Sequence, residues 1–203
     1  SNNFDYSRPD VAIWTDSLMM LKKCKALYTG KDIPIVPNIV DDAAFPFVAQ
    51  SEREPGMIIV FPRKGSYFID EVFSKYRRDG GTYWRPKLLH RLPFKKLARC
   101  FGRAQAFFAA ADVEGCALPP QESMAAGVVV TGKDAGGANF CMQHEETALV
   151  STDVTEAVEN LKRLEDGDLR QRLADTAHRF ISRYFPAAEP AGFWRDILGL
   201  PSS

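Results

Sequence analysis

EGCALPPQESMAAG, residues 114–127, is the stretch of sequence that decides the fold. It follows the apolar run Ala106–Ala109 and precedes a second apolar run at 128–130. Proline suits the first turn of a helix, where its missing N–H has no helical partner to lose, so Pro119 or Pro120 predicts a helix start. The closing glycine of the stretch predicts the helix end. An order of strand, loop, helix and strand is typical of a parallel sheet covered by helices.

The same alternation of short apolar runs and helical segments extends along the chain. Strands are predicted at Val11–Trp14, Ile33–Val36, Met57–Phe61, Tyr83–Leu92, Ala106–Ala109, Gly127–Thr131 and Ala148–Val150. Helices are predicted after Ser66 as an N-cap, at 94–101, from Asp153 with Glu156 as a capping box, and at 169–184 before Pro186. These patterns predict an α/β fold, a Rossmann-like parallel sheet with helices on both faces. Residues 37–56 are the predicted surface loop.

Bulk composition limits the class of protein. The 203 residues suffice for one domain of good size or one lobe of a larger enzyme. The 26 basic residues balance the 26 acidic ones, so no overall charge points to nucleic acid. No apolar run approaches the length of a membrane span, and no signal pattern opens the sequence. Four scattered cysteines fit a reducing compartment, and we expect a cytoplasmic protein.

Two carboxylates flank the start of the predicted helix. The backbone amides from Gly115 to Leu118 lie just ahead of it, where unpaired N–H groups and the helix dipole favour an anion such as a diphosphate. Glu114 and Glu122 are both expected to face the crevice above the sheet. Carboxylates there accept hydrogen bonds from paired hydroxyls of a sugar or ribose, which favours a nucleotide-sugar over a bare phosphate. Helix capping is the alternative interpretation of the two glutamates.

The spacing of the glutamates resembles a known motif. EGCALPPQESMAAG is similar to E-G-F-G-L-P-x-x-E-A-M-A-x-G of the family-4 glycosyltransferases with the GT-B fold, and departs from it at Cys116, Ala117 and Ser123. IPIVPNIVDDAAF resembles the domain-entry segment of that family, FPRKG its phosphate-binding loop and AGGANF its glycine turn. The resemblance covers residues 10–185 and implies that the chain is the C-terminal half of a GT-B fold.

The resemblance also implies roles for individual residues. Arg63 and Lys64 would contact the donor diphosphate and stabilise the charge that grows on the leaving group, so with Glu114 they would be the catalytic residues. Glu114 would contact the donor sugar, and Glu122 the ribose hydroxyls. The other donor-binding residues implied are Gly115, Cys116, Ala117, Leu118, Ser123, Leu92 near the base-binding loop, and Gly136 and Gly137 in the glycine turn. A solvated turn is the alternative for the basic pair, and chain reversal for the two glycines.

The implied activity is sugar transfer from a nucleoside-diphosphate donor, such as a UDP-sugar, with retained anomeric configuration and no metal or other cofactor. Residues 1–8 are interpreted as a disordered leader or tag scar, 9–185 as the nucleotide-sugar-binding domain, and 186–203 as a C-terminal helix and tail. An N-terminal lobe would hold the acceptor, and without it the chain is expected to bind donor and transfer little sugar. A non-catalytic nucleotide-sugar-binding or regulatory module is the alternative. A dinucleotide-binding Rossmann domain is disfavoured, because no G-x-G-x-x-G follows the first strand.

One basic segment stands out from the balanced composition. Residues 75–103 contain ten Lys and Arg residues and one acid, with Tyr76, Trp84 and Phe94 among the interleaved aromatic residues. Solvated helix faces around the nucleotide cleft are the simplest interpretation. Peripheral contact with anionic lipid at the inner face of a membrane is the alternative partner, and nucleic acid is not expected. His144, near a cysteine and two glutamates, matches no zinc spacing, so no metal site is predicted.

Overall fold

The computed structural model describes residues 5–36, 38–136, 139–185 and 188–200. Its centre is a five-stranded parallel sheet in the order β2-β1-β3-β4-β5. The strands are β1 Glu54–Val60, β2 Arg85–Leu88, β3 Ala104–Ala109, β4 Val129–Gly132 and β5 Ala148–Val150. β3 is buried at every position, as expected for a parallel strand with helices on both faces. The predicted α/β fold is confirmed.

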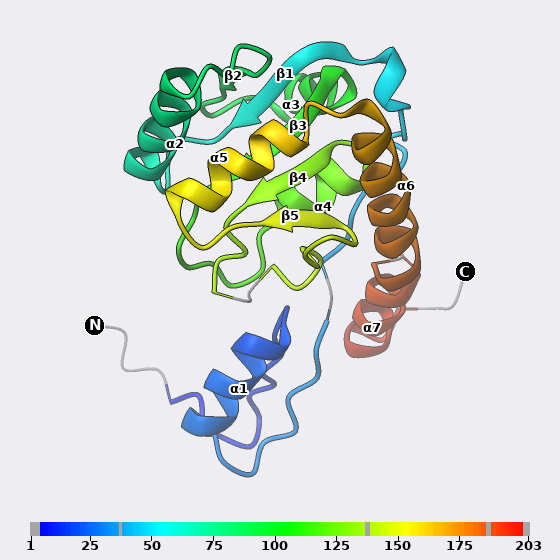
Figure 1. Cartoon of the computed structure of the whole chain (residues 1–203). Helices are drawn as coiled ribbons and strands as arrows, with labels where there is room; N and C mark the ends of the chain where they lie inside the picture. Colours follow the sequence, from blue (N-terminus) through cyan, green and yellow to red (C-terminus); the bar gives the residue numbers. More distant parts are fainter. Residues whose placement is uncertain (1–4, 37, 137–138, 186–187, 201–203) are drawn as a thin grey trace.

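Helices cover both faces of this sheet (Figure 1). The covering helices are α2 Ser66–Arg78, α3 Phe94–Arg103, α4 Leu118–Ala125, α5 Val154–Arg163 and α6 Gly167–Tyr184, with a short 3-10 turn η1 at Gln50–Glu52. No described residue of the other two helices, α1 Leu18–Leu27 and α7 Ala188–Leu198, belongs to a core cluster of the sheet. The buried residues of α2 and α5 belong to one core cluster and those of α3 and α4 to the other, while α6 contributes to both. None of the described helices combines the length and apolar character that a membrane crossing requires.

The apolar stripe of α2 decides which side of the helix packs on the sheet. Its members recur at three- and four-residue spacing and are all buried, namely Phe68, Ile69, Val72, Phe73 and Tyr76. The predicted N-cap is wrong by one residue, because the helix begins at Ser66 and the cap is Gly65 with φ 75°. The chain turns sharply there between β1 and α2, and glycine adopts this left-handed conformation without strain.

The N-terminal segment departs from the prediction. The apolar runs at 11–14 and 33–36 form no strands and pair only through the bridge between Thr15 and Ile35. Between them lies α1, which the sequence analysis missed because it carries no continuous apolar stripe and none of its residues is fully buried. Figure 1 shows α1 set apart from the sheet and its helices. Without neighbouring strands, these two apolar runs have no ladder to join.

The segment before β1 is a surface loop only in part, since residues 41–43, 46 and 47 are exposed but others are buried. Phe45, Gln50 and Arg53 are buried, and β1 already begins at Glu54. The guanidinium of Arg53 donates hydrogen bonds to four backbone carbonyl oxygens, those of Val48, Phe101, Ala104 and Ala126. Burial lowers the pKa of Arg53 to about 10, so the side chain remains charged at neutral pH. Arg53 therefore joins the ends of α3 and α4 to the start of β3.

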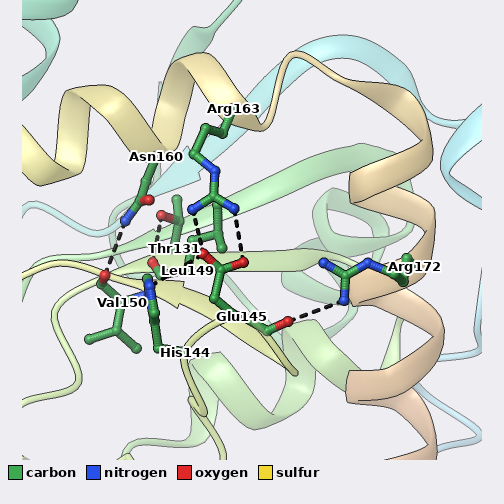
Figure 2. A network of polar contacts seen from close by, with 8 residues as sticks. All are labelled: Thr131, His144, Glu145, Leu149, Val150, Asn160, Arg163 and Arg172. Carbon is green, nitrogen blue, oxygen red and sulfur yellow. Dashed lines mark hydrogen bonds and ion pairs between the residues drawn. The ribbon is translucent and has the colours of Figure 1, made fainter.

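Side chains partner the exposed backbone of edge strand β5 (Figure 2). The N–H of Val150 donates to Nδ1 of His144 at 3.0 Å, and its carbonyl oxygen accepts from Nδ2 of Asn160 at 3.0 Å. Glu145 accepts two hydrogen bonds from Arg163, at 2.6 and 2.8 Å. The side chain of His144 therefore accepts a hydrogen bond from the backbone of the edge strand. Among the residues that the structure describes, no cluster of three or more potential metal ligands is found.

Candidate functional site

Two loops meet at the carboxyl edge of the sheet. β1 and β3 are neighbours, and the chain leaves β1 toward β2 on one side and β3 toward β4 on the other. In open parallel sheets, ligands bind at such a reversal of strand order. The loop at 61–65 follows β1 and contains Arg63 and Lys64, and the loop at 110–117 follows β3 and contains Glu114. The three residues predicted to be catalytic therefore lie on these two loops.

A cleft of about 690 Å³ opens between the loops. The sequence-selected residues in its lining are Arg63, Lys64, Leu92, Glu114, Cys116, Ala117 and Leu118. The sequence analysis did not select several other lining residues, among them Phe61, Leu89, His90, Arg91, Leu97 and Asn139. Apolar walls with a few convergent polar groups, in this range of volume, are typical of small-molecule sites.

Lys64 and Glu114 form an ion pair at the mouth of this cleft. Nζ of Lys64 lies 2.7 Å from Oε2 of Glu114, and both side chains are partly exposed. Arg63 is exposed and has no ion pair among the described residues. One carboxylate thus offsets one of two cations, and the group keeps a net positive charge. This arrangement suits a diphosphate, because Glu114 orients Lys64 while the guanidinium of Arg63 is available to phosphate oxygens.

A close backbone contact sets the distance between the two loops. Gly65 has φ 75°, and a Cβ at this position would lie 2.1 Å from the carbonyl oxygen of Ala110. Only glycine allows backbone to approach backbone this closely in a left-handed conformation. Gly65 directly follows Lys64, and Ala110 begins the loop that carries Glu114. The contact therefore positions the two partners of the ion pair.

The start of α4 offers fewer N–H donors to an anion than the sequence suggested. The helix begins at Leu118, so Pro119 and Pro120 fill its first turn and carry no N–H. The N–H of Ala117 is donated to Oδ1 of Asn139, at 3.2 Å. Most of the charge complementarity to an anion must therefore come from the basic loop after β1.

Glu122 and Ser123 are not among the residues that line the cleft. Ser123 is fully buried, and its Oγ has no hydrogen-bond partner among the described residues, so the structure does not bring its side chain to the pocket as predicted. Glu122 is 9% exposed, and burial raises the pKa of its carboxyl to about 6. Both side chains are kept out of the cleft because α4 packs between the sheet and α6, which buries all of residues 120–125.

Gly136, in the segment after β4, is not among the residues that line the cleft. Gly136 has φ 68° and donates its N–H to Oδ1 of Asp134 at 3.0 Å, so the structure shows it in a chain reversal. Gly137 lies outside the described residues. Asn139, which ends the same AGGANF segment, does line the cleft. Its short polar side chain after the two glycines is the signal that could have identified it.

A second hollow, of about 550 Å³, adjoins the cleft through Leu118. Its lining includes Trp14, Asp16, Met20, Gly115 and Trp194. The N-terminal segment is attached here by two hydrogen bonds: Oγ of Ser17 donates to the carbonyl oxygen of Gly115 at 3.0 Å, and Nδ2 of Asn38 donates to that of Cys116 at 3.2 Å. The structure therefore places Gly115 in this hollow, at the contact between the loop after β3 and the α1 segment.

The buried carboxyl of Glu122 predicts a dependence of stability on pH. Its pKa is raised from an ordinary value of 4.5 to about 6, so the folded chain holds this proton more tightly than the unfolded chain does. The stabilising contribution is complete below about pH 4.5 and is lost as the pH rises through 6, a change of about 2 kcal/mol. Glu122→Gln should therefore be more stable than the parent at pH 7 and similar at pH 4, as measured by urea denaturation.

Glu156 provides a control of opposite sign. Its carboxylate accepts hydrogen bonds from the N–H and hydroxyl of Thr152, both at 2.8 Å, which lowers its pKa. Glu156→Gln should lose stability at neutral pH and approach the parent in acid. Equal stability of the Glu122→Gln variant and the parent at both pH values would contradict the raised pKa.

Two sequence comparisons find similarity to glycosyltransferases. The family model described as glycosyl transferases group 1 matches residues 86–180. The chain is 27% identical over 139 residues to glycosyltransferase 1 domain-containing protein 1 of Xenopus tropicalis, an alignment that covers 67% of the chain and 39% of that protein.

Two solved structures show the same fold. Sucrose-phosphate synthase from Thermosynechococcus elongatus superposes with a TM-score of 0.75 at 16% identity, over 95% of this chain and 59% of that one. HepE from Anabaena, in complex with UDP-glucose, superposes with a TM-score of 0.73 at 14% identity, over 96% of this chain and 65% of that one. The chain thus spans 39 to 65% of the lengths of these three relatives.

Proposed function

Because the chain resembles the C-terminal domain of the group 1 glycosyltransferases with the GT-B fold, we propose that it binds a nucleoside-diphosphate sugar and is the donor-binding part of a retaining glycosyltransferase. UDP is the proposed nucleotide, since HepE was solved with UDP-glucose. The observation that carries the proposal is the cleft at the reversal of strand order, with the Lys64–Glu114 pair and Arg63 at its mouth.

The chemistry of these residues suits departure of a nucleoside diphosphate. Negative charge grows on the diphosphate as the glycosidic bond breaks, and cations fixed beside it stabilise that charge without a proton donor. We propose that Arg63 and Lys64 bind the diphosphate and that Glu114 contacts the donor sugar. For Glu122 we propose contact with the ribose hydroxyls, as the resemblance implies; its carboxylate has no hydrogen-bond partner among the described residues, but it lies outside the cleft lining.

The apolar part of the cleft is the proposed place for the base. Leu89, Leu92 and Leu97 line it, together with Phe61 from the end of β1. A planar base buries its faces against such walls, while the ribose and diphosphate point toward the polar mouth. Cys116 takes part as a neutral group, since burial raises the pKa of its thiol to about 11.

We further propose that the acceptor is held by a lobe that packs beside α1 and α7. Exposed apolar side chains gather on these elements and the segment between α1 and β1: Leu18, Leu27, Ile35, Ile39, Ile197 and Leu198. Exposed apolar side chains that form a contiguous patch are typical of an interface. Residues 1–203 alone are then expected to bind donor nucleotide but to transfer little sugar, because acceptor and anomeric carbon are brought together between lobes.

The test is calorimetric titration of the chain with UDP, GDP and ADP, and then with sugar esters of the diphosphate that binds. Binding to one base is expected. Arg63→Ala and Lys64→Ala should each weaken it by about 10- to 100-fold, because each removes charge-assisted hydrogen bonds to phosphate. Lys133→Ala is the matched control: this lysine also pairs with a carboxylate at the same edge of the sheet, Asp112 at 2.5 Å, but does not line the cleft.

The outcomes separate the alternatives. Unchanged affinity in both Arg63→Ala and Lys64→Ala would show that the donor site lies elsewhere. Donor binding without transfer in a longer protein that includes the acceptor lobe would indicate a non-catalytic nucleotide-sugar-binding module instead.

A further inference from the structure

The proposed donor cleft does not account for the basic segment at 75–103. This segment holds ten of the 26 Lys and Arg residues but one of the 26 Asp and Glu residues, and the rest of the chain therefore carries 16 basic and 25 acidic residues. Positive and negative charges balance over the whole chain, but the positive excess is concentrated in residues 75–103. Such separation indicates a partner with negative charge.

The structure places these residues around one edge of the sheet. They lie on the last turn of α2, along edge strand β2, on the loop after β2 and on α3. β2 forms one edge of the sheet, with α2 over one face and α3 over the other (Figure 1). We call this surface the basic face and define it by eight exposed residues: Arg77, Arg78, Arg85, Lys87, Arg91, Lys95, Lys96 and Arg99.

These charges are not used within the fold. The ion pairs of the segment involve Lys75 with Asp79 and Arg103 with Glu54, both outside the basic face as defined. No member of the basic face forms an ion pair with another described residue. Arg85 donates to the backbone carbonyl oxygen of Pro55 and remains exposed. The face therefore presents unneutralised positive charge to the surroundings.

Two of the large aromatic residues of the segment are not available to stack on nucleic-acid bases. Tyr76 and Trp84, which stacking on bases would require at the surface, are buried at 1% and 3% exposure. Nε1 of Trp84 donates to a backbone carbonyl oxygen inside the molecule, that of Leu161, at 2.7 Å. The exposed large apolar residues are Leu88, Leu92 and Phe94 instead. Aliphatic and phenyl groups among lysines and arginines suit the headgroup boundary of a bilayer.

The basic face also borders the cleft. His90, Arg91 and Leu92, in the loop after β2, line the cleft, as does Leu97 on α3. A lipid surface against the basic face would thus lie beside the cleft mouth.

We propose that the basic face docks on the surface of a bilayer that contains anionic lipid, with Leu88 and Phe94 at the headgroup boundary. The inference has a second part, which rests on the proposed function. A donor-binding cleft beside a membrane serves an acceptor that is itself anchored in lipid, so the substrate class is a lipid-linked glycan or glycolipid.

The test is co-sedimentation of residues 1–203 with vesicles of phosphatidylcholine alone or mixed in equal parts with phosphatidylglycerol. Binding is expected only to the anionic vesicles, and it should fall strongly at about 0.5 M salt, where exposed charges are screened. Reversal of Lys95, Lys96 and Arg99 to Glu should weaken binding about 100-fold or more, since each basic residue near such a surface contributes about fivefold. Leu88→Ser should weaken it about fivefold.

The matched control reverses three exposed lysines of α1, Lys22, Lys23 and Lys25, to Glu. This variant has the same net charge as the α3 variant and should bind vesicles as the parent does. Equal loss in both variants, or no binding of the parent at low salt, would overturn the proposal, as would preference for duplex or single-stranded DNA over anionic vesicles. Lys95, Lys96 and Arg99 do not line the cleft, so UDP titration of the α3 variant shows that it is folded and tests the donor site separately.

Discussion

Arg53→Ala is expected to lower the free energy of unfolding by about 5 kcal/mol. The guanidinium is buried and donates to four backbone carbonyl oxygens, and each buried acceptor left without a donor costs about 1 to 3 kcal/mol. The truncation also leaves a cavity between α3, α4 and the start of β3. Since a domain of this kind has a total stability of about 5 to 15 kcal/mol, the variant should be close to unfolded at 37 °C.

Urea denaturation followed by circular dichroism measures this effect, and Arg103→Ala is its control. Arg103 forms an exposed ion pair with Glu54, at 2.7 Å, so its removal should cost less than about 1 kcal/mol. Arg53→Lys should lie between the two, because an ammonium keeps the charge but cannot span the carbonyl oxygens that the planar guanidinium reaches. A loss below about 2 kcal/mol for Arg53→Ala would mean that water replaces the guanidinium at these carbonyls.

Gly65→Ala is expected to cost about 4 kcal/mol and to weaken donor binding. A methyl group at this position would meet the carbonyl oxygen of Ala110 at 2.1 Å, and the φ of 75° is itself unfavourable for alanine. The two loops must then separate. Because Gly65 follows Lys64, separation moves the ammonium away from Glu114 and from the proposed diphosphate position.

Gly80→Ala separates the two causes of this effect. Gly80 has a φ of 85°, but no atom lies within 4 Å of the position that an added methyl group would take, so its substitution imposes backbone strain without a clash. We expect a cost of about 1 kcal/mol and unchanged UDP affinity. If the two glycine variants lost the same stability and bound UDP equally well, the contact between the loops would not be what positions the site.

Local patterns were sufficient to predict most of the sheet. Four of the five strands overlap predicted apolar runs, because parallel strands between two helical layers bury both faces and appear as continuous apolar segments. The fifth, β2, is a mostly exposed edge strand of four residues, RPKL, within the longer segment predicted at Tyr83–Leu92. α2 was predicted from its three- and four-residue spacing, because a helix that buries one side carries its apolar residues at that spacing. The runs at 11–14 and 33–36 are equally apolar but form no strands, since strand formation also needs a neighbour, and a local pattern does not include one.

The site was predicted less completely than the fold. The resemblance to the glycosyltransferase motifs singled out Arg63 and Glu114, and the structure places both in the lining of one cleft. Asn139 was missed, and Ser123 was assigned to a pocket that its side chain does not reach. The sequence shows how far each residue of α4 lies from the start of the helix. It does not show which side of the helix faces the sheet, because that depends on how α4 packs against α6.

The sequence by itself determined the class of fold and the two loops that carry the site, because burial pattern, helical period and turn residues are properties of neighbouring positions. Only the tertiary structure decided that Lys64 meets Glu114, that Gly65 touches Ala110, and that the basic residues of three elements lie around the same edge of the sheet. These contacts join segments that are distant along the chain. Their geometry depends on strand order and helix packing, which arise only when the whole core is assembled.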